Sequence, residues 1–199
     1  MSVTPGGPSP RRIEPVGGET VYDGRLVQIR IERFRHADGE EVTREIVRHQ
    51  GAVAVVACDE ERVWLVRQPR EAVMDPDLLE LPAGRLDVEG EEPLAAARRE
   101  LAEEIGFGAR SWEPILSYWS SAGFSDERVH LFLARDLYEQ HADSGENERI
   151  EIVPWPLAQL DVAIAQCEDA KTLIGLQWLA RRLNAPLHSQ GAAGERANS

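Results

Sequence analysis

Apolar and polar residues alternate near the N-terminus of the chain. In residues 20–49 apolar residues, among them Leu26, Ile29, Ile31 and Phe34, alternate with polar ones, a pattern that is typical of strands with one buried face. The dipeptide Asp38-Gly39 divides this segment, and Asp-Gly between two alternating runs is a strong hairpin signal. We therefore expect an N-terminal β-hairpin within a region that spans residues 13–49.

A continuous apolar run predicts the centre of a core sheet. Residues 52–57 read AVAVVA, and such a run of β-forming residues is typical of a strand buried on both faces. Further strands are expected at similar segments, namely residues 62–68, 114–119, 128–134 and 149–155.

Three segments have helical character. Residues 157–167 and 169–183 carry apolar residues at helical intervals. A third helix is expected between Pro93, which suits the first helical turn, and Gly106, which suits the end of a helix. Strands and helices together predict an α/β (α+β) domain, in which helices pack on a sheet over residues 50–183.

Both ends of the chain have little to bury. Residues 1–12 are rich in proline, glycine and serine, and residues 184–199 are mostly small or polar. We expect both segments to be disordered tails.

Composition and charge exclude several classes of protein. The net charge of −13 over 199 residues argues against nucleic acid as a partner, because proteins that bind it usually carry a basic patch. No segment approaches the roughly 18 apolar residues of a membrane span. Cys58 and Cys167 lack a paired spacing, and the N-terminus lacks the apolar core of a signal peptide. We therefore expect a cytoplasmic protein with free thiols.

Acidic residues cluster along the helix expected after Pro93. Glu100 and Glu104 are four residues apart and lie one above the other on its flank, and Glu103 points further towards solvent. Arg99 can orient one of these acids but cannot neutralise three. Mg²⁺ and Mn²⁺ can, because they favour carboxylate and carbonyl oxygens. The alternative is a solvated acidic face without a metal.

Residues 84–107 (GRLDVEGEEPLAAARRELAEEIGF) resemble the signature of the Nudix hydrolase family. The helical half fits throughout, and the fitting residues are Arg99, Glu100, Leu101, Glu103, Glu104, Gly106 and Phe107. The loop before the helix is one residue longer than the usual pattern, between Gly84 and Glu91. Outside the signature, VRQPR (66–70), LELPAG (79–84) and SAGFSDE (121–127) are similar to the ADP-ribose pyrophosphatase branch.

The resemblance implies a fold and a reaction. The implied fold is a Nudix-type α/β/α sandwich with a mixed sheet, preceded by the N-terminal hairpin. The implied reaction is Mg²⁺-assisted attack of water on the diphosphate of ADP-ribose, giving AMP and ribose 5-phosphate. Two alternatives remain. Ala122 replaces a proline that is usual in the branch, which favours another nucleoside diphosphate sugar such as a UDP- or GDP-sugar. A non-catalytic nucleotide-sensing module is the second, although the signature acids are all present.

The resemblance also implies roles for individual residues. Glu100 and Glu104, supported by Glu103, would bind the metal together with the backbone carbonyl of Ala83. A catalytic base would come from the segment SGENERIEI, and Glu146 is favoured over Glu148. A solvated acidic loop is the alternative for both.

Further residues match positions that contact the substrate in the family. Arg70 matches an arginine that faces phosphate or ribose, and Arg44 and Glu45 match positions that meet the nucleotide, often from the partner subunit of a homodimer. Trp119 and Phe124 flank the SSAGF loop, where stacking on the substrate and core packing are equal explanations. We therefore expect a homodimer whose N-terminal hairpin helps to build the partner's site.

Overall fold

The computed structural model describes residues 12–140, 142 and 149–184. Within these residues the chain forms two compact units. The first, called here the N-terminal unit, comprises residues 12–51 and 118–128. The second, called the core unit, comprises residues 52–117 and the described residues from 129 onward.

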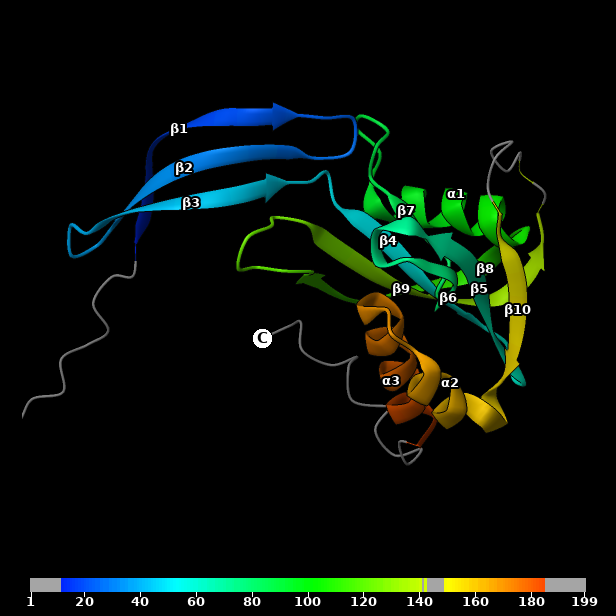
Figure 1. Cartoon of the computed structure of the whole chain (residues 1–199). Helices are drawn as coiled ribbons and strands as arrows, with labels where there is room; N and C mark the ends of the chain where they lie inside the picture. Colours follow the sequence, from blue (N-terminus) through cyan, green and yellow to red (C-terminus); the bar gives the residue numbers. More distant parts are fainter. Residues whose placement is uncertain (1–11, 141, 143–148, 185–199) are drawn as a thin grey trace, which may run out of the picture. The chain divides into compact units, whose positions relative to one another are not determined.

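The N-terminal unit is built on a three-stranded antiparallel sheet, where the sequence predicted a two-stranded hairpin (Figure 1). Its strands, in the order of the sheet, are β1 (Ile13–Asp23), β2 (Gln28–His36) and β3 (Glu41–Arg48). The predicted turn is confirmed: Gly39 has φ 89° and donates its N–H to the carbonyl of His36 at 3.0 Å. Strand β1 was missed because Pro15, Gly17 and two β-bulges interrupt its alternation.

The loop after β8 is hydrogen-bonded to β3 inside the same unit. The N–H of Val47 donates to the carbonyl of Phe124 at 2.8 Å, and Val47 also bridges to Ser125. The Arg48 guanidinium donates to Asp126 at 2.8 Å and to the buried carboxylate of Glu32 at 2.8 Å. This network fixes the SSAGF loop against the sheet.

The core unit contains a mixed sheet in the order β10-β5-β4-β9-β8. Strands β4 and β9 are parallel, whereas β4 pairs antiparallel with β5 and β5 with β10. Two short strands join this sheet, β6 on β5 and β7 on β4. The bounds are β4 Ala52–Cys58, β5 Arg62–Arg70, β6 Asp75–Glu80, β7 Ala83–Arg85, β8 Phe107–Trp119, β9 Arg128–Glu139 and β10 Glu151–Pro156.

Helices cover both faces of this sheet, as Figure 1 shows with α1 in green and α2 and α3 in orange. Helix α1 (Pro93–Ile105) packs on the face that carries Val53 and Val55. Helices α2 (Leu160–Gln166) and α3 (Ala170–Asn184) pack on the face that carries Ala54 and Val56. The continuous apolar run of β4 thus serves two cores on alternate residues, and the predicted α/β/α sandwich is confirmed.

Two details of the predicted elements differ. The segment expected to be helical from residue 157 begins with a short 3-10 turn, Leu157–Gln159, and α2 follows it. A second 3-10 turn, Glu71–Val73, connects β5 to β6. Strand β8 begins at Phe107, directly after α1, seven residues before the predicted start at residue 114.

Among the described residues, no helix combines the length and the hydropathy that crossing a membrane requires.

Candidate active site

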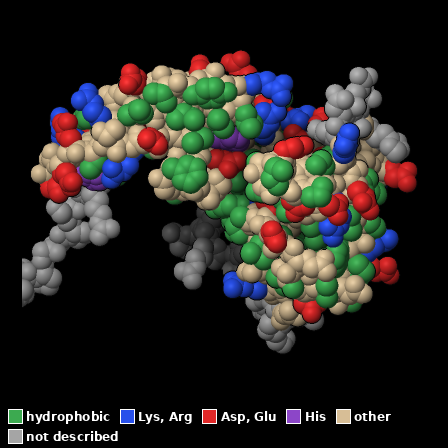
Figure 2. Space-filling model, in the orientation of Figure 1, with side chains coloured by type: hydrophobic (Ala, Val, Ile, Leu, Met, Phe, Trp, Pro, Cys, Tyr) green, Lys and Arg blue, Asp and Glu red, His purple; other side chains and the backbone are tan. Residues whose placement is uncertain are grey.

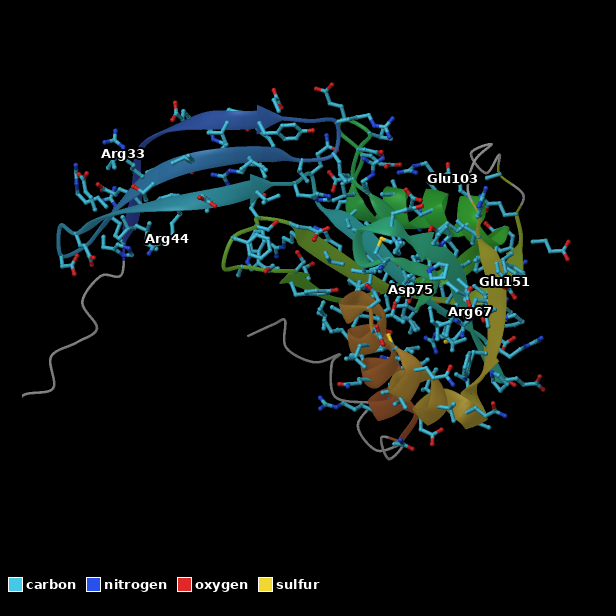
Figure 3. All side chains as sticks on the ribbon, viewed as in Figure 1. Arg33, Arg44, Arg67, Asp75, Glu103 and Glu151 are labelled. Atoms are coloured by element: carbon cyan, nitrogen blue, oxygen red, sulfur yellow. The ribbon has the colours of Figure 1, made fainter. Side chains whose placement is uncertain are left out.

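Helix α1 presents one apolar face to the core and one acidic flank. Pro93 stands at its start, and Gly106 ends it with φ 72° and an N–H donated to the carbonyl of Ala102 at 3.1 Å. Ala97, Leu101 and Ile105 are buried against the sheet. The positions between them carry the acids of the Nudix-like segment, and Figure 3 labels Glu103 on this helix.

The Arg99 guanidinium is the centre of the acidic cluster. It donates to Glu100 at 2.6 Å and to Glu103 at 3.1 Å, and it binds both carboxylate oxygens of Glu91 at 3.2 and 2.9 Å. A carboxylate oxygen of Asp87 lies 3.9 Å from it. Hydrogen bonds to Glu91 raise the pKa of Arg99, so this side chain stays charged. The sequence predicted that Arg99 would orient one acid, and the structure shows it holding several.

The backbone of β7 lies against the acidic flank of α1. The N–H of Ala83 donates to the Glu104 carboxylate at 2.9 Å. A Cβ placed on Gly84 would lie 1.8 Å from the carboxyl carbon of Glu100. The Glu100 carboxylate can occupy this position only because residue 84 has no side chain. This steric requirement explains why the motif has a glycine here. The backbone of Ala83 and Gly84 and the carboxylates of Glu100 and Glu104 therefore lie close together, and their role as metal ligands stays a prediction.

The cluster has more negative charge than its arginine can balance. Burial raises the pKa of Glu100, an effect that the charge of Arg99 only partly opposes and that Glu103 and Asp87 reinforce. A half-buried carboxylate of this kind favours a further cation. The donors available are carboxylates and the neighbouring backbone, which is the chemistry that Mg²⁺ and Mn²⁺ prefer.

Among the described residues, the acids of α1 contact Arg99 and the backbone of β7. Within the residues that the structure describes, no three His, Cys, Asp or Glu side chains form a group that could hold a metal ion. Glu100 and Glu103 are instead hydrogen-bonded to Arg99. The donor set fits a divalent cation by its chemistry, and binding one would require these carboxylates to exchange part of their contact with Arg99 for contact with the metal.

Arg70 lies in the core unit at the end of β5, and its main contact was missed from the sequence. Its Nε and Nη2 atoms donate to the two oxygens of Glu80, with Nη2 at 2.9 Å. Glu80 is fully buried, and it also accepts from Lys171 of α3. The signal in the sequence was a lone acid in the apolar run LLELP.

The remaining substrate-binding candidates belong to the N-terminal unit. Arg44 is exposed on β3 (Figure 3) and donates to the carbonyl of Thr43 at 2.8 Å, and Glu45 is its exposed neighbour. Trp119 is 51% exposed, and its ring centroid lies 5.3 Å from the guanidinium carbon of Arg128. Phe124 is 55% exposed. Neither aromatic residue is part of the core in this structure, which leaves both available for stacking.

The predicted catalytic base falls outside the part of the chain that the structure describes. Glu146 and Glu148 lie outside the described residues, in the segment between β9 and β10. Their roles stay predictions from the sequence.

The fold and the acidic helix together define a class of protein, and comparison with known families identifies it. Residues 48–173, more than half of the 199 residues, match the NUDIX domain. The chain belongs to the NUDIX family.

Several relatives are similar over most of their length. An ADP-ribose pyrophosphatase of Bacillus subtilis is 36% identical over 169 residues, which cover 82% of this chain and 90% of that protein. An ADP-ribose pyrophosphatase of Mycobacterium tuberculosis is 38% identical over 149 residues, covering 73% of this chain and 72% of that protein. The methanol dehydrogenase activator of Bacillus methanolicus is 35% identical over 166 residues, covering 81% and 89% respectively.

A solved structure is similar in fold. The crystal structure of an ADP compounds hydrolase aligns with a TM-score of 0.77, covering 89% of this chain and 97% of that one, at 23% sequence identity. At this identity the likeness supports the fold, and it agrees with the sandwich described above.

Proposed function

We propose that this chain hydrolyses the diphosphate of ADP-ribose to AMP and ribose 5-phosphate in a reaction that depends on Mg²⁺, with Mn²⁺ as a substitute. The observation that carries the proposal is the acidic flank of α1, packed against Ala83 and Gly84, in a NUDIX chain 36% identical to an ADP-ribose pyrophosphatase. The excess of carboxylates around Arg99 supports a metal-assisted reaction.

In this proposal, separate residues of the chain bind the cation and orient its ligands. Glu100, Glu103, Glu104 and the carbonyl of Ala83 would hold the cation. When bound, it would neutralise charge on the diphosphate oxygens and lower the pKa of a coordinated water. Arg99 keeps the carboxylates oriented through its hydrogen bonds.

Hydrolysis also needs a proton acceptor. In the proposal Glu146, or alternatively Glu148, takes a proton from the attacking water as its oxygen forms a bond to phosphorus. The bond between that phosphorus and the bridging oxygen breaks, and the bridging oxygen keeps the electron pair and leaves with the other phosphate. One water is consumed, and the two products are phosphate monoesters.

Substrate recognition is assigned to cations and exposed aromatic residues. Arg70 would contact the phosphate or ribose part of the substrate. Arg44 and Glu45 would meet the nucleotide, and Trp119 and Phe124 would contribute stacking surfaces. Arg44, Glu45, Trp119 and Phe124 are exposed, which supports this role.

A homodimer is part of the proposal. The N-terminal unit exposes several large apolar side chains, and Figure 2 shows hydrophobic surface over its sheet. The exposed residues include Ile13, Val21, Tyr22 and Leu26. Exposed apolar surface on a small sheet favours a partner that covers it.

Both cysteines are free thiols, which supports a reducing compartment such as the cytoplasm.

An assay of the purified protein against a panel of nucleoside diphosphate sugars, with Mg²⁺ and with EDTA, tests the proposal. The expected result is release of AMP from ADP-ribose at a kcat/KM at least about tenfold above that for the other compounds, abolished by EDTA. A preference for a UDP- or GDP-sugar would assign the alternative substrate, which Ala122 in the SSAGF loop favours. Nucleotide binding without hydrolysis of any compound would instead indicate a sensing module.

A further inference from the structure

A closed ring of contacts joins the end of β6 to the start of α3 in the core unit. The buried carboxylate of Glu80 accepts from Lys171, which pairs with Asp169 at 3.0 Å. Asp169 accepts from the hydroxyl of Thr172 at 2.6 Å, and that hydroxyl accepts from the N–H of Leu81 at 2.7 Å. Because Leu81 follows Glu80 in the chain, these contacts form a closed ring. The ring fixes the Glu80 carboxylate in both position and direction.

Arg70 is attached to the ring at one edge of its guanidinium. Its Nε and Nη2 atoms donate to the two oxygens of Glu80. A guanidinium has five N–H donors in a rigid plane, so this bidentate contact sets the direction of the donors that remain. The Glu80 side chain is 1% exposed, whereas the Arg70 side chain is 41% exposed. One edge of Arg70 is thus held inside the protein and the other faces outward.

The ring lies close in the chain to the backbone that supports the acidic cluster. Glu80 and Leu81 precede Pro82, whose carbonyl accepts from Val55 at 2.9 Å, and Ala83, whose N–H binds Glu104. Hydrogen bonds to Glu80 raise the pKa of Arg70, and the charge of Glu104 adds to this effect. The outward edge of Arg70 therefore lies within electrostatic reach of a carboxylate assigned to metal binding.

We infer that Glu80, held by Lys171 and the start of α3, is a positioning residue that aims Arg70 at a phosphate of the substrate. The inference rests on the proposed function, and it adds a residue that touches no substrate. A neutral side chain at position 80 would keep the volume but would lose one of the two strong acceptors. Arg70 would then rotate, and its outward donors would lose their fixed direction.

The kinetic test uses Glu80→Gln with the substrate that the wild type hydrolyses best. The expected result is a KM raised about tenfold with kcat changed much less, because one charge-assisted contact to phosphate is weakened. In the Arg70→Ala background, Glu80→Gln should cause no further loss of kcat/KM, since its effect passes through Arg70. Losses that multiply in the double variant would overturn the inference.

A matched control and a second variant separate positioning from folding. The control is Glu113→Gln. Glu113, like Glu80, accepts from one arginine through both of its oxygens, here from Arg182 of α3 at 2.8 and 2.9 Å. This variant should leave KM unchanged. If Glu80→Gln fails to fold, Glu80→Asp keeps the charge but withdraws the carboxylate by one methylene, and a raised KM is expected again. An unchanged KM in the folded variant would contradict the inference.

A readout independent of turnover separates this inference from the proposed function. The ¹⁵Nε–Hε NMR signal of Arg70, assigned by its loss in Arg70→Lys, should show slow exchange with solvent in the wild type and fast exchange in Glu80→Gln. Added inorganic pyrophosphate should shift this signal in the wild type with about tenfold higher affinity than in the variant. If the wild-type signal does not respond to pyrophosphate, Arg70 faces no anion and the inference is wrong, whatever the enzyme hydrolyses.

Discussion

The carboxylate of Glu100 occupies the space where a side chain on Gly84 would lie, because a Cβ there would approach the carboxyl carbon to 1.8 Å. Gly84→Ala should therefore displace the Glu100 carboxylate while leaving the backbone in place, since the contact is with the end of a flexible side chain. We expect hydrolysis to fall about 100-fold, the order of loss that follows a displacement of about 1 Å in a catalytic group. Steady-state kinetics and circular dichroism measure the two effects.

The matched control for this prediction is Gly39→Asn. Gly39 has φ 89°, and no heavy atom lies within 4 Å of the position that a Cβ would take there. Asparagine tolerates this backbone region better than most residues, so the control should keep wild-type activity. Near-normal activity of Gly84→Ala would show that Glu100 does not need its observed position.

Glu104→Gln should abolish most of the turnover and preserve the fold. Its amide oxygen can still accept the N–H of Ala83, which now bonds Glu104 at 2.9 Å, but the negative charge is lost. We expect kcat to fall by about 100-fold or more, because charge stabilisation is central to the proposed reaction. Exposed Glu139, on β9, provides the control Glu139→Gln. A Glu104→Gln variant with activity within about threefold of wild type would exclude Glu104 as a metal ligand.

The two glutamates between β9 and β10 can be distinguished by kinetics. Glu146→Gln should lower kcat more than it raises KM, because a general base acts in the transition state. If Glu148→Gln shows this pattern instead, the two roles are exchanged. Two variants with unchanged kcat would place the base elsewhere in the chain.

The contribution of Glu80 to stability should depend on pH. Burial raises the pKa of Glu80, but hydrogen bonds from Arg70 and the charge of Lys171 outweigh it, so the folded-state pKa lies below the ordinary value. A lowered carboxyl pKa stabilises the fold above the unfolded-state pKa of about 4.3, and this stabilisation is lost as the pH falls through the folded-state pKa.

Denaturant unfolding of the wild type and of Glu80→Gln between pH 3 and pH 7 measures this dependence. Near neutral pH the variant should be less stable by about 3 kcal/mol, the order of loss when one partner of a buried ion pair is removed. The difference in the free energy of unfolding should shrink as the pH falls. A difference that stays constant with pH would mean that Glu80 is already protonated in the folded protein.

A homodimer has a mass twice that of the 22.2 kDa chain, which light scattering at micromolar concentration would show. If the dimer shares its sites, mixing Arg44→Ala subunits with Glu104→Gln subunits should restore activity, because one site of the mixed dimer then carries neither lesion. A mass of one chain would rule out the dimer. A dimer without recovered activity would show that each site is built by one subunit.

The sequence by itself determined the features that depend on neighbouring residues. Helix α1 follows from Pro93, Gly106 and the spacing of its apolar face, all within one segment. The run AVAVVA predicted a strand buried on both faces, and its alternate residues do serve two separate cores. The family signature could be recognised from the sequence because the residues of its helical half lie in consecutive turns of one helix, α1.

Tertiary structure decided what depends on residues that are distant in the chain or lack a local period. Strand β1 has a broken alternation, and its register with β2 forms around bulges that sequence periodicity does not reveal. The pairing of Glu80 with Lys171 joins residues 91 positions apart. A lone acid in an apolar run shows only that a partner is needed, because burying a carboxylate costs free energy unless a cation compensates it. Which cation does so is set by the packing of α3 on the sheet.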